Sequence, residues 1–583
     1  MAGGPCGMEH MHIIRFLGRR EYGLGATALA FIVLQVYLDL KLPDYMQTIT
    51  TLIVTPGTAM GRVLGEGALM LGCALGSMLA TVVTEYCMAV IGTSMAQRMR
   101  AGVFDATLDF SMAEIGEFST PSLITRSTND VTQIQMFVVM AVQLLVRSPI
   151  VAVWAILKIS DANMTWTLAT GAAVAVLVTP RMMRMQRITD DLNRVTREHL
   201  SGLRVIRAYN SQGFHGRRFE AANAELTGAN TFVNNAFAFL MPSLTAIMSG
   251  LSLAIYVLGA VMIDAATGAE RLTLFSQMIV FSAYALQIVG AFMMLAFVFI
   301  FMPRARVAWR RIREVLSTEP GIADGAARVG RSRASGEVEF RNVSFRYPDA
   351  EDDALKDVSF TARPGQTVAI IGSTGSGKSS IVNLVPRFYD VREGQVLVDG
   401  RDVREWEQKA LRDRISFVPQ RATLFSGTIA SNIDFGRGAR EVTPRDVVEA
   451  AEAASAVEFI AAREGRYASA VAQGGSNFSG GQKQRLAIAR AVARGGGVMI
   501  FDDSFSALDY KTDRDVRAAL RRTAADATVI IVAQRIGTVR GADRILVVDR
   551  GRIVGAGTHS ELLETCSVYR EIALSQLSEE ELA

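Results

Sequence analysis

The residues with the clearest chemical meaning form a glycine-rich stretch in the C-terminal half of the chain. A short apolar segment, 369–371, leads into it, and its members are Gly372, Ser373, Thr374, Gly375, Ser376, Gly377, Lys378, Ser379 and Ser380. A helical pattern of apolar residues follows, and a strand–loop–helix with this spacing is typical of a phosphate-binding loop. The glycines let backbone N–H groups face phosphates, Lys378 supplies a positive charge, and the Ser379 hydroxyl can coordinate Mg²⁺. We therefore expect a site for phosphates and Mg²⁺ here.

A second apolar segment, Val498–Phe501, ends in two adjacent acids, Asp502 and Asp503. An acid at the end of a buried strand is well placed to hold Mg²⁺, directly or through water. A solvated strand end is the simpler alternative. The glycine-rich loop upstream favours the magnesium role for Asp502.

The N-terminal half has the composition of a membrane domain. Half of the 583 residues are hydrophobic, the mean hydropathy is +0.24, and charged residues are scarce in long stretches before residue 302. A bilayer core of about 30 Å requires about 20 apolar residues per helix. Six segments approach or reach this length: 22–40, 64–92, 136–157, 164–179, 238–263 and 277–301. The fourth is short and ends at Pro180. The first could be a signal peptide, but no clear cleavage site follows it, so we expect an uncleaved span.

The distribution of arginines predicts how these spans are oriented. The segments after the second and fourth spans are long, and the later one contains Arg181, Arg184, Arg187, Arg194, Arg197, Arg204, Arg207, Arg217 and Arg218. Basic loops stay in the cytoplasm. The N-terminus, both long segments and the C-terminal half are therefore expected there, in a multi-pass protein of the cell membrane (inner or plasma membrane).

The two long segments, 93–135 and 180–237, have amphipathic helical patterns that extend the spans beyond the bilayer. Each contains a polar break at which a helix could turn, at 118–121 and at 208–211. These elbows could transmit movement to and from the C-terminal domain. They could equally be surface loops.

Some residues within the spans have two readings. An ionisable group inside a bilayer is costly and usually faces a polar cavity, so Glu66, Glu85 or Arg147 could line a substrate path. The two glutamates could instead lie near the ends of a helix longer than the bilayer. Methionines on the fifth and sixth spans could form an adaptable binding wall or pack ordinarily: Met241, Met248, Met278, Met293 and Met294.

The composition disfavours several classes of protein. The net charge is only +4, and no basic tract is interleaved with aromatic residues, so nothing indicates nucleic-acid binding. The four cysteines share no metal-ligand spacing, and a disulfide framework is not expected for them. They are Cys6, Cys73, Cys87 and Cys566.

Three further motifs carry a family resemblance. Asn477–Arg485 resembles the signature motif of ABC transporters, with Phe478 where the family most often has Leu. Pro419-Gln420 resembles the Q-loop of that family and Ser506–Asp509 resembles its D-loop. The motifs occur in family order, downstream of the predicted spans. The chain thus resembles an ABC exporter-type half-transporter over nearly its whole length.

This resemblance implies an all-α transmembrane domain of six helices over 1–305, a linker over 306–333 and an α/β P-loop ATPase domain over 334–583. It implies that ATP and Mg²⁺ bind between the phosphate-binding loop of one chain and the signature of a second, and that the two elbows are coupling helices. Besides the loop, it assigns to the nucleotide Tyr347, as the aromatic that stacks on adenine, and Ser479, Gly480, Gly481 and Gln482. It assigns Ser379, Gln420 and Asp502 to the metal, and Gln420 also to catalysis.

Two departures from the family pattern matter most. The acid after the magnesium ligand is normally Glu, the general base for the attacking water, whereas Asp503 is shorter by roughly 1.5 Å. A positioned base contributes about 10²–10⁴-fold to a rate. The family has His where this chain has Gln534, and Gln can hydrogen-bond to a γ-phosphate but cannot carry a positive charge. Both changes weaken the same reaction, which favours one common cause.

The favoured hypothesis is half of a heterodimeric, multidrug-like exporter of hydrophobic or amphipathic compounds. The phosphate-binding loop, Asp503 and Gln534 would line a degenerate ATP site, and the intact signature would complete a competent site on the partner. Alternatives are a transporter for a dedicated lipid, peptide or siderophore, a homodimer with impaired hydrolysis, and an ATP-gated channel or regulator. A soluble ATPase acting on DNA would share the motifs but not the spans.

Overall fold

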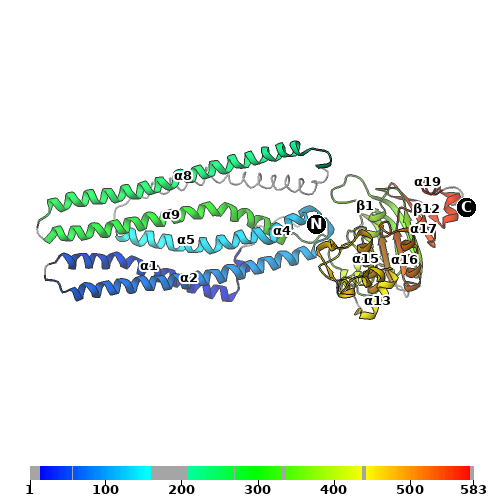
Figure 1. Cartoon of the computed structure of the whole chain (residues 1–583), viewed down its shortest axis with the longest axis horizontal. Helices are drawn as coiled ribbons and strands as arrows, with labels where there is room; N and C mark the ends of the chain where they lie inside the picture. The colour runs from blue at the N-terminus through cyan, green and yellow to red at the C-terminus, as the bar shows by residue number, and fades with distance from the viewer. Residues whose placement is uncertain are drawn as a thin grey trace. The chain divides into compact units, whose positions relative to one another are not determined.

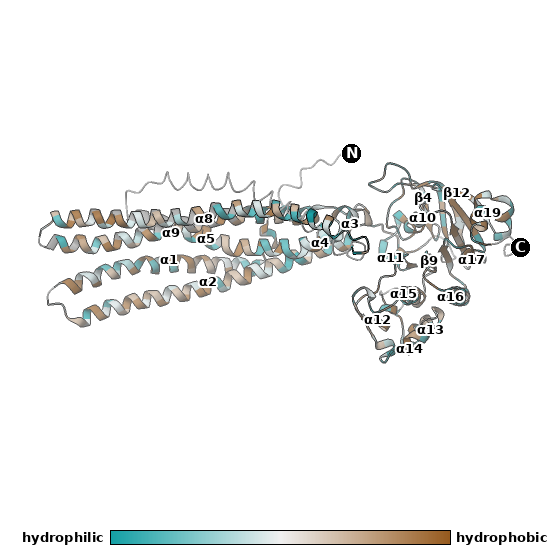
Figure 2. Ribbon diagram, turned by 45° about the horizontal axis from the view of Figure 1, so that its top comes forward, coloured by the Kyte–Doolittle hydropathy of each residue, from teal (hydrophilic) through white to brown (hydrophobic). Residues whose placement is uncertain are grey.

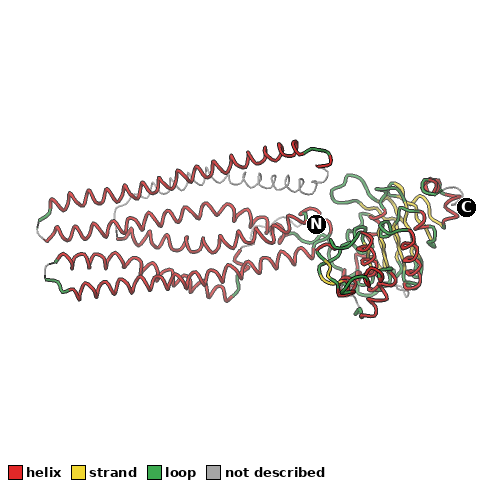
Figure 3. Tube along the Cα trace, viewed as in Figure 1, coloured by secondary structure: helices red, strands yellow, loops and turns green. Residues whose placement is uncertain are grey.

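The computed structural model describes residues 13–55, 57–158, 207–267, 269–330, 336–435 and 441–577. It divides into two compact units, one formed by Met1–Asp109 with Ser119–Glu319 and the other by Phe110–Phe118 with Pro320–Ala583. The described strands all lie in the second unit (Figure 3). The expected fourth span, 164–179, and the arginines from 181 to 204 lie outside the described residues.

The N-terminal half is built from long helices, as its uninterrupted apolar periodicity predicts. In chain order they are η1 Ile13–Phe16, α1 Arg19–Val54, α2 Met60–Asp109, α3 Met112–Phe118, α4 Thr120–Thr125, the π-helical turn η2 Arg126–Asp130, α5 Val131–Lys158, α8 Gln212–Ala265 and α9 Ala269–Ser317. Helix α9 continues into the segment expected to be a linker.

Four stretches among the described residues are long and apolar enough to cross a membrane. They are Arg19–Val54, Met60–Asp109, Thr120–Val151 and Met248–Ala265. The expected sixth span, 277–301, lies within α9, where a shorter apolar stretch covers Leu274–Tyr284. The described part of the chain therefore accounts for four such stretches and not for the expected six.

Helices α1 and α2 lie side by side, as do α5 and α9 (Figure 1). Large apolar side chains are exposed along α2, including Leu64, Leu71, Leu79 and Val82. Figure 2 shows apolar residues distributed along these long helices. An exposed apolar surface of this extent marks contact with lipid or with a partner, and helices satisfy their own backbone groups in a bilayer.

Polar side chains join α1 to its neighbours within this apolar unit. Arg147 of α5 donates a hydrogen bond to Asp39 of α1 at 3.1 Å, and Ser77 of α2 donates to the other oxygen of the same carboxylate. The hydroxyl of Tyr284, on α9, lies 2.7 Å from Asp44 Oδ1. Arg147, which the sequence offered for a substrate path, therefore has a carboxylate partner on another helix.

The surroundings of Glu85, Glu66 and Met278 bear on whether these residues line a substrate path or have ordinary structural roles. Glu85 accepts a hydrogen bond from Gln143 at 2.7 Å. Glu66 lies near the start of α2, which at 50 residues is longer than a bilayer requires. The Met278 side chain packs so closely on Gly259 of α8 that a Cβ there would lie 2.5 Å from its sulfur. This contact is ordinary helix packing.

The structure has a non-helical residue at each expected elbow. Ser119 has a φ of +59° between α3 and α4, and Asn210 has a φ of +51° just before α8. A left-handed residue cannot continue a right-handed helix, so the chain turns at both places. The segment Phe110–Phe118, which precedes the first turn, groups with the C-terminal unit, where Gly321 N donates to Glu114 Oε1 at 3.3 Å.

Beyond α4, the π-helical turn is tied to the end of α9 by ion pairs. Arg126 lies 2.9 Å from Glu314, and Arg311 lies 3.4 Å from Asp130. Arg126 and Asp130 are both buried. Because buried charges are retained only with partners, these pairs fix the start of α5 against α9.

The C-terminal unit contains two main sheets and a two-stranded one. The strands are β1 Val338–Phe345, β2 Leu355–Ala362, β3 Thr367–Ile371, β4 Glu393–Val398, β5 Arg401–Asp402, β6 Ile415–Val418, β7 Gly427–Thr428, β8 Ala470–Val471, β9 Val498–Asp502, β10 Thr528–Val532, β11 Arg544–Asp549 and β12 Arg552–Gly557. The six-stranded sheet has the order β12-β11-β3-β10-β9-β6. Its inner strands are parallel, and their central residues are buried, as continuous Val/Ile-rich strands predict. The antiparallel sheet has the order β2-β1-β4-β5.

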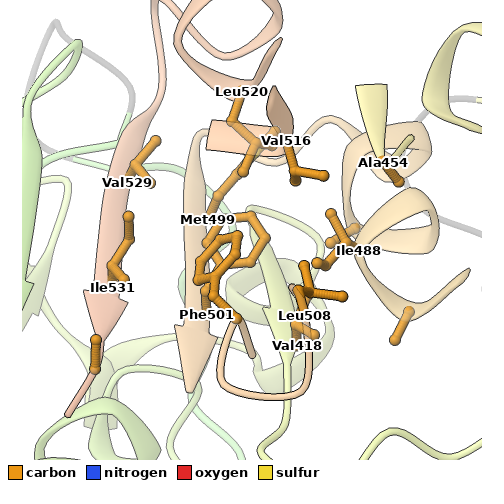
Figure 4. Close-up of a cluster of buried hydrophobic side chains, with 14 of the residues drawn as sticks. Val418, Ala454, Ile488, Met499, Phe501, Leu508, Val516, Leu520, Val529 and Ile531 are labelled. Atoms are coloured by element: carbon orange, nitrogen blue, oxygen red, sulfur yellow. The ribbon is translucent and has the colours of Figure 1, made fainter. Parts of the chain in front are cut away.

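The C-terminal unit also contains helices, several of which enclose an apolar core against the parallel sheet. They are α10 Lys378–Leu384, η3 Val403–Glu405, α11 Gln408–Arg412, α12 Ile429–Ile433, α13 Pro444–Ala453, α14 Val457–Ala461, η4 Arg466–Ala468, η5 Gln473–Gly475, α15 Gly480–Arg494, α16 Tyr510–Thr523, α17 Ile536–Val539, α18 His559–Thr565 and α19 Ser567–Leu574. Figure 4 shows Met499 and Phe501 of β9 beside Ile488 of α15 and Val516 of α16. This core fixes the parallel strands whose ends carry the candidate site.

The order of the parallel strands explains why separated motifs meet. The glycine-rich loop follows β3, residue 420 follows β6, residue 502 ends β9 with 503 directly after it, and residue 534 follows β10. Carboxyl ends of parallel strands share one edge of a sheet, which is where such sheets bind ligands. The sheet therefore gathers these motifs at a single edge.

Candidate nucleotide-binding site

The glycine-rich loop has a backbone that only its glycines allow. Gly375 and Gly377 have φ values of +80° and +103°, which are strained for other residues. A Cβ on Gly372 would collide with the carbonyl oxygen of Val548. The loop therefore curls tightly against neighbouring backbone, as a cradle for phosphate oxygens must.

The Lys378 ammonium is folded back onto this loop. Its Nζ donates to the carbonyl oxygens of Gly372 at 2.9 Å and Ser373 at 2.6 Å. Burial lowers the pKa of Lys378, and the nearby charges of Asp503 and Asp502 partly offset that effect. Carbonyl oxygens are weaker partners for an ammonium than phosphate oxygens, so these contacts suit a lysine that exchanges them for a bound anion.

Asp502 is a buried carboxylate at the end of β9. Its Oδ1 accepts a hydrogen bond from the Ser379 hydroxyl at 2.9 Å, and its side chain is only 6% exposed. Burial raises the pKa of Asp502, which the hydrogen bond from Ser379 opposes. A hydroxyl does not neutralise a buried charge. One carboxylate and one hydroxyl leave room for the water and phosphate oxygens that Mg²⁺ prefers, so these residues fit that ion.

The second acid, Asp503, is held by two glutamine amides. The Nε2 atoms of Gln534 and Gln420 donate to the same oxygen, Oδ2, at 3.0 Å and 3.2 Å. The backbone of Asp503 is left-handed, with a φ of +45°, a conformation that Asp tolerates better than longer side chains. The residues where the sequence departs from the family are thus directly hydrogen-bonded to each other.

Tyr347 follows β1 and lies next to the loop. Its hydroxyl is 3.0 Å from the hydroxyl of Ser380, and its ring meets Tyr389 edge to face with centroids 5.2 Å apart. Burial raises the pKa of Tyr389. An aromatic ring therefore lies beside the loop, and its stacking on adenine stays a prediction.

The signature motif begins helix α15. Ser479 caps the helix by accepting from Gln482 N at 3.3 Å, while Gln482 Oε1 accepts from Ser479 N at 3.1 Å. This reciprocal capping box between Ser479 and Gln482 satisfies N–H groups that a helix start leaves unpaired. Gly481 lies against the D-loop, where a Cβ would be 3.1 Å from Ala507 O. Within the described residues, no hydrogen bond links 479–482 to the loop 372–380 of the same chain.

The unusual Phe478 in the signature has its own support. It is buried, its ring packs edge to face with Phe459 at 6.4 Å, and the Arg463 guanidinium lies 3.9 Å from its ring centroid. Arg463 also donates to Asn477 O at 3.0 Å. A cation over an aromatic face stabilises both groups, which explains how the larger side chain is accommodated.

The site also contains contacts that no sequence motif predicts. Arg535 donates to Ser506 O at 3.1 Å, and the Ser506 hydroxyl donates to Asp503 O at 2.8 Å. Gln576, near the described C-terminal end, bonds to the backbone beside Gln534. The contacts of Arg535 and Gln576 join segments far apart in sequence, and an isolated Arg or Gln gives no local signal of such a contact.

Family models match both halves of the chain. The model described as "ABC transporter transmembrane region" matches residues 65–292, and the model described as "ABC transporter" matches residues 355–506. The fold resembles a structure titled "Structure of a bacterial Atm1-family ABC exporter with ATP bound", with a TM-score of 0.79 at 24% identity, over 96% of this chain and 100% of that one.

Relatives resemble the chain along most of its length. An uncharacterized ABC transporter ATP-binding protein of Mycobacterium tuberculosis is 40% identical over 547 residues, which are 91% of this chain and 93% of the relative. An ATP-dependent lipid A-core flippase of Aromatoleum aromaticum is 32% identical over 508 residues, or 85% and 82% of the two chains. The chain therefore belongs to the ABC transporter family, as a multi-pass membrane protein that carries an ATP-binding ABC domain after its transmembrane region.

Proposed function

We propose that this chain is one half of a heterodimeric ABC exporter and that its own phosphate-binding loop lines an ATP site that hydrolyses ATP slowly or not at all. The observation that carries the proposal is the contact of Gln420 and Gln534 with one oxygen of Asp503. A general base must offer a free lone pair to the attacking water. Here two neutral N–H groups occupy one of the two carboxylate oxygens, Oδ2, which reduces the lone pairs left for that water.

The other residues of the site suit binding of ATP without efficient hydrolysis. The loop 372–380 and Lys378 hold the phosphates, Ser379, Asp502 and Gln420 hold Mg²⁺, and Tyr347 stacks on adenine. Gln534 offers a hydrogen bond to the γ-phosphate but no positive charge to stabilise the transition state. A site of this kind keeps ATP bound between the two ATP-binding domains and thereby keeps them together.

The intact signature gives this chain a second role, on its partner. Ser479, Gly480, Gly481 and Gln482 form a regular helix start that departs from the family pattern only at the preceding Phe478. They complete the partner's ATP site, where hydrolysis resets the transport cycle. A complete signature beside an altered base favours two different chains over a homodimer.

The transport step uses the two elbows as coupling elements. The segment Phe110–Phe118 groups with the ATP-binding unit and touches it through Glu114. The turn at Ser119 leads through α4 and η2 into the membrane helix α5, and the turn at Asn210 leads into α8. Closure of the ATP-binding domains is carried through these segments, and the membrane cavity turns outward.

The cargo that we propose is a hydrophobic or amphipathic compound. The described membrane helices carry apolar faces with few ionisable groups, which suit adaptable binding of such molecules. A dedicated lipid is the second candidate, because a flippase for lipid A-core is 32% identical to this chain. Uptake of labelled dyes and of labelled lipids into inside-out vesicles separates the two.

The ATP site is tested by expressing the chain alone in lipid nanodiscs and measuring turnover against the complex with its partner. We expect the isolated chain to hydrolyse ATP at least about 10²-fold more slowly than the complex, because a positioned general base contributes about that factor to the rate. The isolated chain should still retain unhydrolysed ATP. Lys378→Ala gives the background without nucleotide binding. Turnover by the isolated chain equal to that of the complex would refute the proposal.

A further inference from the structure

The side chain of Gln576 forms two hydrogen bonds with the segment that carries Gln534. Its Nε2 donates to Gln534 O at 2.7 Å, and its Oε1 accepts from Ile536 N at 2.8 Å. One amide thus pairs with a carbonyl and an N–H two residues apart, as a neighbouring strand would. Among the described residues, no other side chain makes such a paired contact with the backbone of 534–536.

The position of Gln576 is fixed by the C-terminal helix. Tyr569 and Ala573 of α19 are completely buried in the core of the ATP-binding domain. The Tyr569 hydroxyl lies 2.7 Å from His559 Nδ1, which ties α19 to α18. After α19, Gln576 N and Leu577 N donate to Ala573 O at 3.1 Å and 2.9 Å. The amide is therefore presented from an anchored turn and not from a free tail.

The contact with Gln576 supplies hydrogen-bond partners that the backbone of 534–536 lacks within its own segment. Ile536 begins α17, a helix of only four residues, and the first N–H groups of a helix have no partner within it. Gln576 satisfies the N–H of Ile536 and the carbonyl of Gln534 together. On one side Gln534 is held through its side chain by Asp503, and on the other through its carbonyl by Gln576.

We infer that Gln576 is a positioning residue for the ATP site, setting where the Gln534 side chain stands relative to the γ-phosphate. The C-terminal segment thereby governs how strongly the site distinguishes ATP from ADP. This inference rests on the proposed role of Gln534 as the partner of the γ-phosphate. Gln576 itself touches backbone only and acts through Gln534.

The test uses the full-length chain in lipid nanodiscs and measures affinity for ATP and for ADP with Mg²⁺. Gln576→Ala removes both hydrogen bonds, and Gln576→Glu keeps an acceptor for Ile536 N–H but sets a carboxylate against Gln534 O. We expect both variants to bind ATP about three- to tenfold more weakly, the effect of one or two lost hydrogen bonds, and to bind ADP as before. Ser575→Ala is the matched control, because among the described residues that hydroxyl bonds only to Ile572 O of the preceding helix.

A double-mutant cycle with Gln534→Ala shows whether the effect passes through Gln534. If it does, Gln576→Ala adds nothing to Gln534→Ala, since residues in one network are not additive. Equal losses for ATP and ADP, additive effects, or wild-type affinity in Gln576→Glu would overturn the inference. If Gln534→Ala itself leaves the preference for ATP unchanged, the proposed function of the site fails instead. The thermal midpoint without nucleotide checks that each variant is folded.

Discussion

The Nε2 atom of Gln534 donates to Asp503 Oδ2 at 3.0 Å, so the two departures from the ABC family pattern that bear on hydrolysis form one contact. Gln420, which follows β6 on the other side of β9, donates to the same oxygen. A histidine at position 534 could carry a charge, and a glutamate at 503 would reach farther. The present pair does neither, and its two members hold each other in place.

This contact predicts that neither family residue restores hydrolysis alone. Asp503→Glu should raise ATP turnover by less than about threefold, because the left-handed backbone at 503 disfavours a longer side chain and Gln534 still lacks charge. Asp503→Glu combined with Gln534→His should raise ATP turnover by at least about tenfold, toward the rate gain that a positioned general base provides. Phosphate release by the isolated chain in nanodiscs measures both.

The control for that experiment is the double variant with Lys378→Ala added, which should abolish the gain. A large gain from Asp503→Glu by itself would contradict the coupling between the two positions. It would mean that reach alone, and not the shared hydrogen bond, limits hydrolysis.

Asp502 gives a prediction on stability and pH. Burial raises its pKa above the ordinary value of 3.8, so its neutral form suits the folded state better than its charged form. The stability that protonated Asp502 gives the folded state is fully present below the unfolded-state pKa of 3.8. It is lost as the pH rises through the raised pKa of the folded state. At pH 7.5 the buried charge is therefore a cost that Asp502→Asn removes, while the amide oxygen still accepts from Ser379.

Without nucleotide or Mg²⁺, Asp502→Asn should raise the thermal midpoint at pH 7.5 by about 2–4 °C, or about 1 kcal/mol for a domain of this size. The difference should shrink as the pH is lowered. With Mg²⁺ and ATP the order should reverse, because only the carboxylate gains from the cation. The exposed Asp526→Asn is the control, and an unchanged midpoint in Asp502→Asn would show that its burial carries no cost.

Part of this site follows from sequence and part does not. The loop 372–380 and the acids 502–503 are local patterns, and the alternation of apolar strands with helices predicts that their ends share an edge. The hydrogen bond from Gln576 to Gln534 crosses 42 positions, and the pairing of Asp39 with Arg147 crosses 108. Such contacts depend on how helices pack, which a single sequence does not encode locally.

The signature also contains a testable adaptation. Arg463 lies over the Phe478 ring and donates to the neighbouring carbonyl of Asn477. Arg463→Ala should speed hydrogen exchange at the amides of 477–482 by about three- to tenfold, for the loss of about 1 kcal/mol in local stability. In the Phe478→Leu background the same change should have a smaller effect, since the aromatic face is gone. Equal effects in both backgrounds would show that only the hydrogen bond matters.

The ion pair between Asp39 and Arg147 provides a last prediction, on the membrane unit. The two side chains are only 25% and 30% exposed, so each change that removes one charge leaves the other poorly solvated. Asp39→Asn or Arg147→Gln should lower the thermal midpoint and yield in nanodiscs, at a cost of about 1–3 kcal/mol. Combining them should recover most of the loss, with a coupling of about 1–2 kcal/mol.

Transport by the double variant then decides between the two readings of Arg147. If the pair only joins α1 to α5, the combined variant should export as the wild type does once its stability is restored. If Arg147 also contacts the cargo, transport should stay impaired in a stable protein. Lys41→Gln is the matched control, because Lys41 is more exposed and lies 3.8 Å from Asp44 within its own helix. Additive losses in the two single variants would show that the pair is not coupled at all.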